Sequence, residues 1–275
     1  MLRHPDAPDR AAFYAALDAF SPFELAEPWD NVGVLLDPFG TDVVERVLLT
    51  IDLGEAVADE AIGWGADAII AYHPPIFSGL KRLTPATAQG RTLLRLITAG
   101  LPVVSPHTAL DATGGGMAEW LAAALGPASD LRPITPTRAR PTDASVGLGR
   151  RGTLEAPLRL PHALTRIKSH LGLQHVRVAA AAPHAGGEAV TSFGVCPGAG
   201  GDLFEAMGPV DLLLTGEMRH HDVLARVAAG TTVVLTDHTN CERGYLPHYV
   251  AQLQRLLPTV QFRISDRDRD PLEVR

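Results

Sequence analysis

The chain has 275 residues, of which 46% are hydrophobic and 20% charged, a composition that excludes a disordered protein and suits one large or two ordinary domains. Its net charge of −7 comes without a dense basic segment, which argues against direct binding of nucleic acid. No apolar run approaches the ~18 residues of a membrane helix, and two cysteines are too few for a disulfide framework, so we expect a cytoplasmic protein with no membrane partner.

Apolar strands and amphipathic helices alternate along the first 126 residues. Segment 54–65 has the pattern of an amphipathic helix and ends on Gly65, a residue type that commonly closes helices. Two further helices are predicted over 86–100 and 114–126. Apolar strands are predicted over 32–36, 46–52 and 66–75, and within 101–111, where the strand runs into a polar loop.

The second half of the chain resumes this alternation after residues 127–160, whose Pro, Thr, Gly and Arg content indicates a linker and an irregular hairpin. Helices are predicted over 200–208 and 219–230. Strands are predicted over 191–196, 209–217 and 231–242, the last again running into a polar loop. Strands that are apolar throughout and alternate with helices predict a parallel or mixed sheet covered on both faces.

Two segments resemble each other closely. Residues 99–111 read AGLPVVSPHTALD and residues 229–242 read AGTTVVLTDHTNCE, and the strands before them also correspond. Matching elements in the same order indicate a duplicated α/β unit. We therefore predict two similar α/β lobes, residues 1–128 and 129–275, each a mixed or parallel sheet covered by helices, with the C-terminal segment able to pack back on the first lobe.

Histidines and acids gather where the predicted strands end. Ligands of open α/β sheets collect at the carboxyl ends of the strands. Imidazole and carboxylate together are the donors preferred by a divalent ion such as Zn, Fe, Mn or Ni. The residues placed there are Tyr72, His73, His107, Asp111, Glu217, His220, His221, His238 and Glu242.

Each of these residues also has a purely structural interpretation. A histidine at a strand end is often a hydrogen-bonded corner residue, Asp111 could cap the following helix, and Glu242 could be a solvated acid. Their clustering at equivalent strand ends favours a metal site. The glycine-rich stretches 147–152 and 196–202 are more consistent with turns than with nucleotide or anion sites, and neither cysteine has a base beside it in the sequence.

Five stretches of the sequence resemble one known family. They are EPWDNVGVLL, AYHPPIFSGLKRLTP, SPHTALDATGGGMAEWLA, TGEMRHHDVLA and DHTNCERGYLP, in this order. By them the chain is similar to the NGG-interacting-factor-three-like family, whose members are often labelled GTP cyclohydrolase 1 type 2 homologues. The resemblance runs from about Glu27 nearly to the C-terminus.

This resemblance implies a fold, a site and an assembly. It implies two lobes with one or two divalent metal ions in the cleft between them, no inserted middle domain, and a toroidal homohexamer. The implied metal ligands are His73, Asp111, His238 and Glu242. Tyr72 stands where many bacterial members have a histidine, so Tyr72, His107 and His221 are candidates for additional ligands or supporting groups.

These residues suggest a metal-dependent hydrolase that acts on a small nucleotide or another phosphorylated metabolite. The metal would activate water, and Glu242 is the candidate catalytic carboxylate. The alternative is a metal carrier or a regulatory assembly without enzymatic activity, because the same ligands serve either role. A metal position left open to water and substrate would distinguish the enzyme from the carrier.

Overall fold

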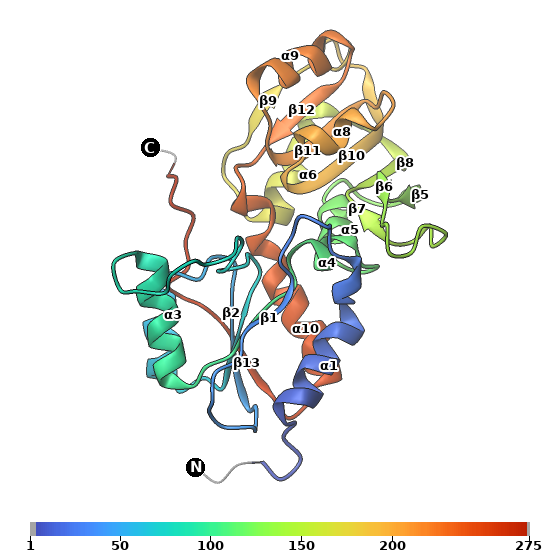
Figure 1. Ribbon diagram of the computed structural model, residues 1–275. Coiled ribbons are helices and arrows are strands. Elements are labelled where there is room, and N and C mark those ends of the chain that lie inside the picture. The colour runs from blue at the N-terminus through green and yellow to red at the C-terminus, as the bar shows by residue number, and fades with distance from the viewer. Residues whose placement is uncertain (1–3, 274–275) are drawn as a thin grey trace. The chain divides into compact units, whose positions relative to one another are not determined.

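The computed structural model describes residues 4–273 and divides the chain into two compact units. Unit 1 consists of residues 1–110 and 246–275, and unit 2 of residues 111–245. The division therefore falls before the boundary at 128 that we placed from the sequence. The reason is local packing, because Leu121 and Leu125 belong to the hydrophobic core of unit 2. Figure 1 shows the ribbon of both units.

Unit 1 is built on a five-stranded mixed sheet. Its strands follow the order β1-β4-β3-β2-β13, in which β13, β2, β3 and β4 are parallel and β1 is antiparallel to β4. The central strands are apolar on both faces, so every residue of β3 is buried. The strands are β1 (Gly33–Leu36), β2 (Arg46–Thr50), β3 (Ala68–Ala71), β4 (Val103–Ser105) and β13 (Gln261–Ile264).

Helices cover both faces of this sheet (Figure 1). Helices α2 (Glu55–Trp64) and α3 (Ala88–Ala99) pack on one face, and both end on a left-handed glycine as predicted. Helices α1 (Arg10–Phe20) and α10 (Leu246–Leu256) cover the other face, where the rings of Phe20 and Tyr249 lie 5.6 Å apart. The segment after β4 is the short helix α4 (His107–Ala112), where the sequence predicted a polar loop.

Unit 2 is built on a six-stranded mixed sheet in the order β5-β8-β10-β11-β12-β9. Strands β10, β11 and β12 are parallel, while β8 and β9 run antiparallel to their neighbours β10 and β12. The strands are β5 (Ala128–Arg132), β8 (Arg150–Arg159), β9 (Arg177–Ala179), β10 (Ala189–Ala199), β11 (Leu212–Glu217) and β12 (Thr232–Leu235).

The interpretation of residues 127–160 as a linker with an irregular hairpin was largely wrong. Only β6 (Thr135–Pro136) and β7 (Gly147–Leu148) form a small separate ladder, and β5 and β8 are strands of the main sheet. Strand β8 buries only Arg150, Leu154 and Leu158, one charged and two apolar residues, so its sequence lacks the apolar run by which strands are recognised.

Two helical layers complete unit 2. Helices α5 (Met117–Ala123) and α6 (Leu160–Leu171) pack on one face of the sheet, around Phe193 and Leu214. Helices α8 (Gly201–Glu205) and α9 (His220–Ala228) pack on the other face, around Leu213. The remaining short helices are α7 (Ala182–Ala185) in unit 2, the 3-10 turns η2 (Thr239–Cys241) and η3 (Arg243–Tyr245) in the same unit, and η1 (Phe23–Leu25) in unit 1.

The two sheets share a topological core. In unit 1 the parallel strands β2, β3 and β4 lie in chain order with an antiparallel strand beside the third, and β10, β11, β12 and β9 repeat that arrangement in unit 2. The predicted mixed α/β fold is thus confirmed. Among residues 4–273, no helix has the length and apolarity required to span a bilayer.

Candidate metal centre

His73 lies at the carboxyl end of β3 in unit 1. The backbone N–H of His73 donates to the carbonyl of Ile51 at 3.0 Å, which continues the parallel ladder between β3 and β2 beyond the last strand residue. Pro74 and Pro75 follow; proline has a fixed φ and no N–H, so the ladder ends there and the chain turns away. The sheet therefore fixes the backbone from which the imidazole projects.

A carboxylate orients this imidazole. Oδ1 of Asp52 lies 2.8 Å from Nδ1 of His73, and an ionised carboxylate can only accept, so Nδ1 carries the hydrogen. The lone pair of the ring is then on Nε2, the arrangement of histidines that bind metals. Asp52 is itself held, because the backbone N–H groups of Ile51 and Asp52 donate to Oδ2 of Asp268 at 2.7 and 3.2 Å. The sequence analysis did not single out Asp52.

His107 forms a second histidine–carboxylate pair in unit 1. Its Nδ1 lies 2.8 Å from both carboxylate oxygens of Asp30, and its backbone has a φ of +25°, a strained value for a residue with a side chain. The ring of Tyr72 is buried and packs edge-on against His107, with 5.4 Å between centroids. His107 also lies 5.5 Å from His73, ring centre to ring centre. His107 and Tyr72 therefore pack around His73 and restrict the position of its ring.

Asp30 fixes the position of His107 through hydrogen bonds. Burial raises the pKa of its carboxyl group, but hydrogen bonds from His107, Thr108 and the backbone of Asn31 outweigh burial and hold the pKa below its usual value. The side chain of Asp30 is fully buried in its ion pair with His107. An ionised carboxylate with this many donors is a fixed negative charge.

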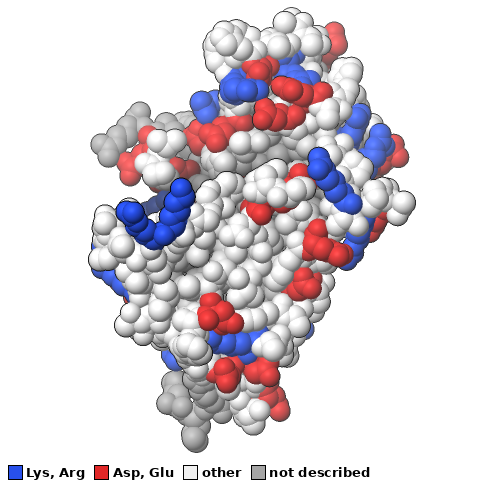
Figure 2. Space-filling model, viewed as in Figure 1, with Lys and Arg blue, Asp and Glu red and all other residues white. Residues whose placement is uncertain are grey.

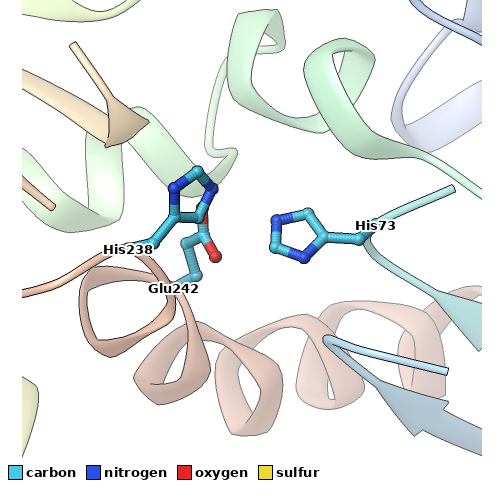
Figure 3. Close-up of side chains that lie close together, drawn as sticks. All are labelled: His73, His238 and Glu242. Atoms are coloured by element: carbon cyan, nitrogen blue, oxygen red, sulfur yellow. The ribbon is translucent and has the colours of Figure 1, made fainter. Parts of the chain in front are cut away.

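His238 and Glu242 are neighbours in unit 2. Nδ1 of His238 lies 2.6 Å from Oε1 of Glu217, the last residue of β11, so this imidazole is also oriented through Nδ1. Its Nε2 is 3.8 Å from Oε1 of Glu242. That separation is too long for a hydrogen bond but within the span of two ligands that each lie about 2.1 Å from one ion. Figure 3 shows the carboxylate of Glu242 beside the imidazole of His238.

A glycine makes room for these two ligand atoms. A Cβ at Gly198 would lie 2.9 Å from Nε2 of His238 and 3.0 Å from Oε1 of Glu242. Gly198 has a φ of +60°, in the left-handed region, and its N–H donates to Sγ of Cys241. The amide of Gly200 donates to Thr215. The stretch 196–202 was predicted as a turn, but residues 196–199 end β10 and residues 201–202 begin α8, so only Gly200 lies between the two elements. The amides of Gly198 and Gly200 are used within the fold, and Gly198 holds backbone close to the ligand atoms.

Asp111 is buried at the end of α4 and lies near the sulfur atoms of unit 2. Burial, the first cause, together with the negative charges of Asp111 and Glu242, raises the pKa of the Cys196 thiol far above its ordinary value. The pKa of Cys241 is raised by burial and by the same two carboxylates. Both thiols are therefore protonated and unsuited to nucleophilic attack at neutral pH.

The remaining sequence candidate, His221, is exposed on the first turn of α9. Its ring lies 5.5 Å from that of its neighbour His220. In unit 1 His73 offers one imidazole nitrogen, and in unit 2 His238 and Glu242 offer one imidazole nitrogen and one carboxylate oxygen (Figure 3). These three residues form the candidate donor group, and their donor types are those that bind a divalent ion. His221 and Asp111 do not belong to this group.

Comparisons with known proteins agree on one family. The model of the family described as Duf34/NIF3 (NGG1p interacting factor 3) matches residues 8–271. The protein NIF3 homolog of Schizosaccharomyces pombe is 42% identical over 233 residues, which cover 83% of this chain and 83% of the relative.

Two solved structures share the fold. The Bacillus cereus protein related to NIF3 aligns with a TM-score of 0.82 at 20% identity, over 98% of this chain and 100% of the other. Reduced HcgD from Methanocaldococcus jannaschii aligns with a TM-score of 0.77 at 21% identity, over 94% of this chain and 98% of the other. At these identities the alignments establish the fold alone.

Proposed function

The chain belongs to the Duf34/NIF3 family, and from this premise we propose that it is a divalent-metal-dependent hydrolase of small nucleotides or other phosphorylated metabolites. The proposed ligands are His73, His238 and Glu242, with Asp111 as a fourth. One observation carries the proposal. Both histidines have Nδ1 beside a carboxylate, Asp52 or Glu217, an arrangement that puts the ring lone pair on Nε2, as in histidines that bind metals.

The donor set suits a borderline divalent ion such as Zn, Fe, Mn or Ni. A bound ion of this kind would act as a Lewis acid that lowers the pKa of a bound water to about 7 and so would provide hydroxide at neutral pH. Glu242 is buried next to His238, and its carboxylate would help to hold the ion and would be the group placed to accept a proton from water. Asp52 and Glu217 keep the imidazoles in the tautomer that binds metal.

The charge distribution supports a small substrate over a polymer. On the face drawn in Figure 2, Lys and Arg side chains are interspersed with Asp and Glu side chains. A nucleic-acid-binding surface has its positive charges concentrated along one track, since affinity comes from neutralising successive phosphates. A single phosphate group needs only the ion and a few donors.

Metal content is the first test. The protein is purified anaerobically without chelators, and metals are counted by mass spectrometry in the wild type and in His73→Ala, His238→Ala and Glu242→Ala. His221→Ala, which removes an exposed histidine outside the group, is the matched control. We expect one or two ions per chain in the wild type and the control, and strongly reduced content in the three variants. Absence of metal from all samples, even after titration, would contradict the proposal.

Activity is the second test. The metal-loaded protein is incubated with a panel of nucleotides, sugar phosphates and other phosphoesters, and phosphate release and ring opening are both measured. Turnover that is lost in Glu242→Gln with metal retained would support the hydrolase. Tight metal binding without turnover of any compound would contradict it and favour the metal carrier.

A further inference from the structure

Two large aromatic side chains of unit 1 are exposed side by side. Trp29 is 58% exposed and Phe77 is 50% exposed, and their ring centroids lie 6.1 Å apart. Each square ångström of apolar surface left in water costs about 25 cal/mol relative to burial. A pair of neighbouring exposed rings is therefore more typical of a binding surface than of chance exposure.

The loops that carry these rings are tied together. Trp29 lies in a turn in which the N–H of Asp30 donates to the carbonyl of Glu27 at 2.9 Å. The side-chain amide of Asn31 donates to the carbonyl of Ile76, the residue before Phe77. The second loop begins with the two prolines, and the carbonyl of Pro75 accepts from Nε2 of Gln89 at 2.6 Å. The rings are thus presented on fixed backbone, which lowers the entropy cost of binding a ligand.

A continuous row of rings leads from this pair to a proposed metal ligand. The indole of Trp29 meets His107 edge-to-face, with 6.3 Å between centroids and an angle of 79°. His107 in turn lies 5.5 Å from His73, at an angle of 81°. The buried Asp30, which binds His107, is the next residue after Trp29. The exposed rings and the proposed ligand His73 therefore belong to one contiguous cluster of rings within unit 1.

We propose that Trp29 and Phe77 form a stacking platform for the planar base of a nucleotide whose phosphate group reaches the metal held by His73. The inference rests on the proposed function and narrows its substrate class to nucleotides. Stacking on an aromatic ring tolerates different bases because every base presents a π face, so purine and pyrimidine nucleotides both bind, the larger purines more tightly.

Equilibrium binding tests the platform directly. Calorimetric titrations of metal-loaded protein use guanosine monophosphate, cytidine monophosphate and ribose 5-phosphate as probes, with nucleotide integrity checked afterwards by chromatography. The variants are Trp29→Ala, Phe77→Ala and, to keep an aromatic ring, Trp29→Phe. Phe39→Ala is the matched control, since Phe39 is a fully exposed aromatic residue of unit 1 away from this row.

The expected results distinguish binding through the base from binding through the phosphate group. Trp29→Ala weakens binding of guanosine monophosphate about 5- to 100-fold, the range of a lost base–aromatic stack, and leaves ribose 5-phosphate and metal content unchanged. Trp29→Phe retains most of the affinity, and Phe39→Ala behaves as the wild type. Equal weakening of nucleotide and ribose 5-phosphate would overturn the proposal. Unchanged nucleotide binding in Trp29→Ala would also overturn the proposal. This includes the outcome in which Trp29→Ala dissociates an assembly of identical chains but binds the nucleotide as the wild type does.

These outcomes are distinct from failure of the proposed function. Hydrolysis of guanosine monophosphate with the same KM in Trp29→Ala as in the wild type would preserve the hydrolase and refute the platform. Conversely, base-dependent nucleotide binding that requires Trp29, in protein that hydrolyses nothing, would preserve the platform and refute the hydrolase.

Discussion

Glu217 and His238 form a short contact in unit 2, with Oε1 of the glutamate 2.6 Å from Nδ1 of the imidazole. Glu217 ends β11 and His238 follows β12, so two adjacent parallel strands bring the pair together. In unit 1, Asp52 follows β2 and His73 follows β3, and these neighbouring strands form a similar pair at 2.8 Å, one strand earlier in the shared strand order. In both units the pairing of adjacent parallel strands thus places a carboxylate next to Nδ1 of a histidine.

Removing the orienting carboxylate should weaken metal binding. We expect Glu217→Ala to lower metal affinity about 10- to 100-fold, because the imidazole of His238 loses the partner that fixes its tautomer and orientation. Glu188→Ala removes an exposed acid of the same unit and serves as control. Competition with a chromophoric chelator measures the affinity. Equal affinities of the two variants would show that Glu217 does not orient the ligand.

Filling the space at Gly198 should also impair the metal site. In Gly198→Ala the new methyl group lies 2.9 Å from Nε2 of His238, so both ligand atoms must shift. Gly172→Ala is the control, since Gly172 has a similar φ of +69° but open space around its Cβ position. Urea unfolding should show a similar backbone penalty of about 1 kcal/mol in both variants. Only Gly198→Ala should lose metal in titrations, and parallel loss in the control would contradict this.

Asp30 should make part of the stability of unit 1 acid-sensitive. Its pKa is lower in the folded than in the unfolded protein, so the folded state binds fewer protons. The stabilisation is therefore complete above the unfolded pKa of about 4 and is lost as pH falls through the folded value. Asp30→Asn should lower the free energy of unfolding by about 1–3 kcal/mol at pH 7. Below pH ~4 the difference between variant and wild type should shrink, which urea titrations at several pH values can measure. A constant difference would contradict the assignment.

Both cysteines should resist alkylation in the native protein. Burial and nearby carboxylates raise the pKa of Cys196 and Cys241, so almost no thiolate is present near neutral pH. We expect iodoacetamide at pH 8 to modify neither residue over a time in which urea-unfolded protein reacts completely. Mass spectrometry of peptides measures each site separately. Rapid native modification of Cys196 would show that its environment stabilises the thiolate after all.

Much of the fold could be predicted from the sequence because its signals are local. Apolar runs and terminal glycines define β2, α2 and α3 to within a few residues. Strand β8 escaped prediction because only a minority of its side chains face the core. Helix α4 was missed because its six residues are too few to show a helical period.

The sequence by itself determined the candidate metal ligands His73, Asp111, His238 and Glu242, because titratable side chains that follow apolar strands are easily recognised in the chain. The tertiary structure determined which carboxylates orient the histidines among them. Asp52 lies 21 residues from His73 along the chain and meets it only because β2 and β3 pair in parallel register. Trp29 is likewise joined to His107 through a turn that the buried Asp30 holds in place. Contacts of this kind depend on strand pairing and loop closure, which a linear pattern of residue types does not encode.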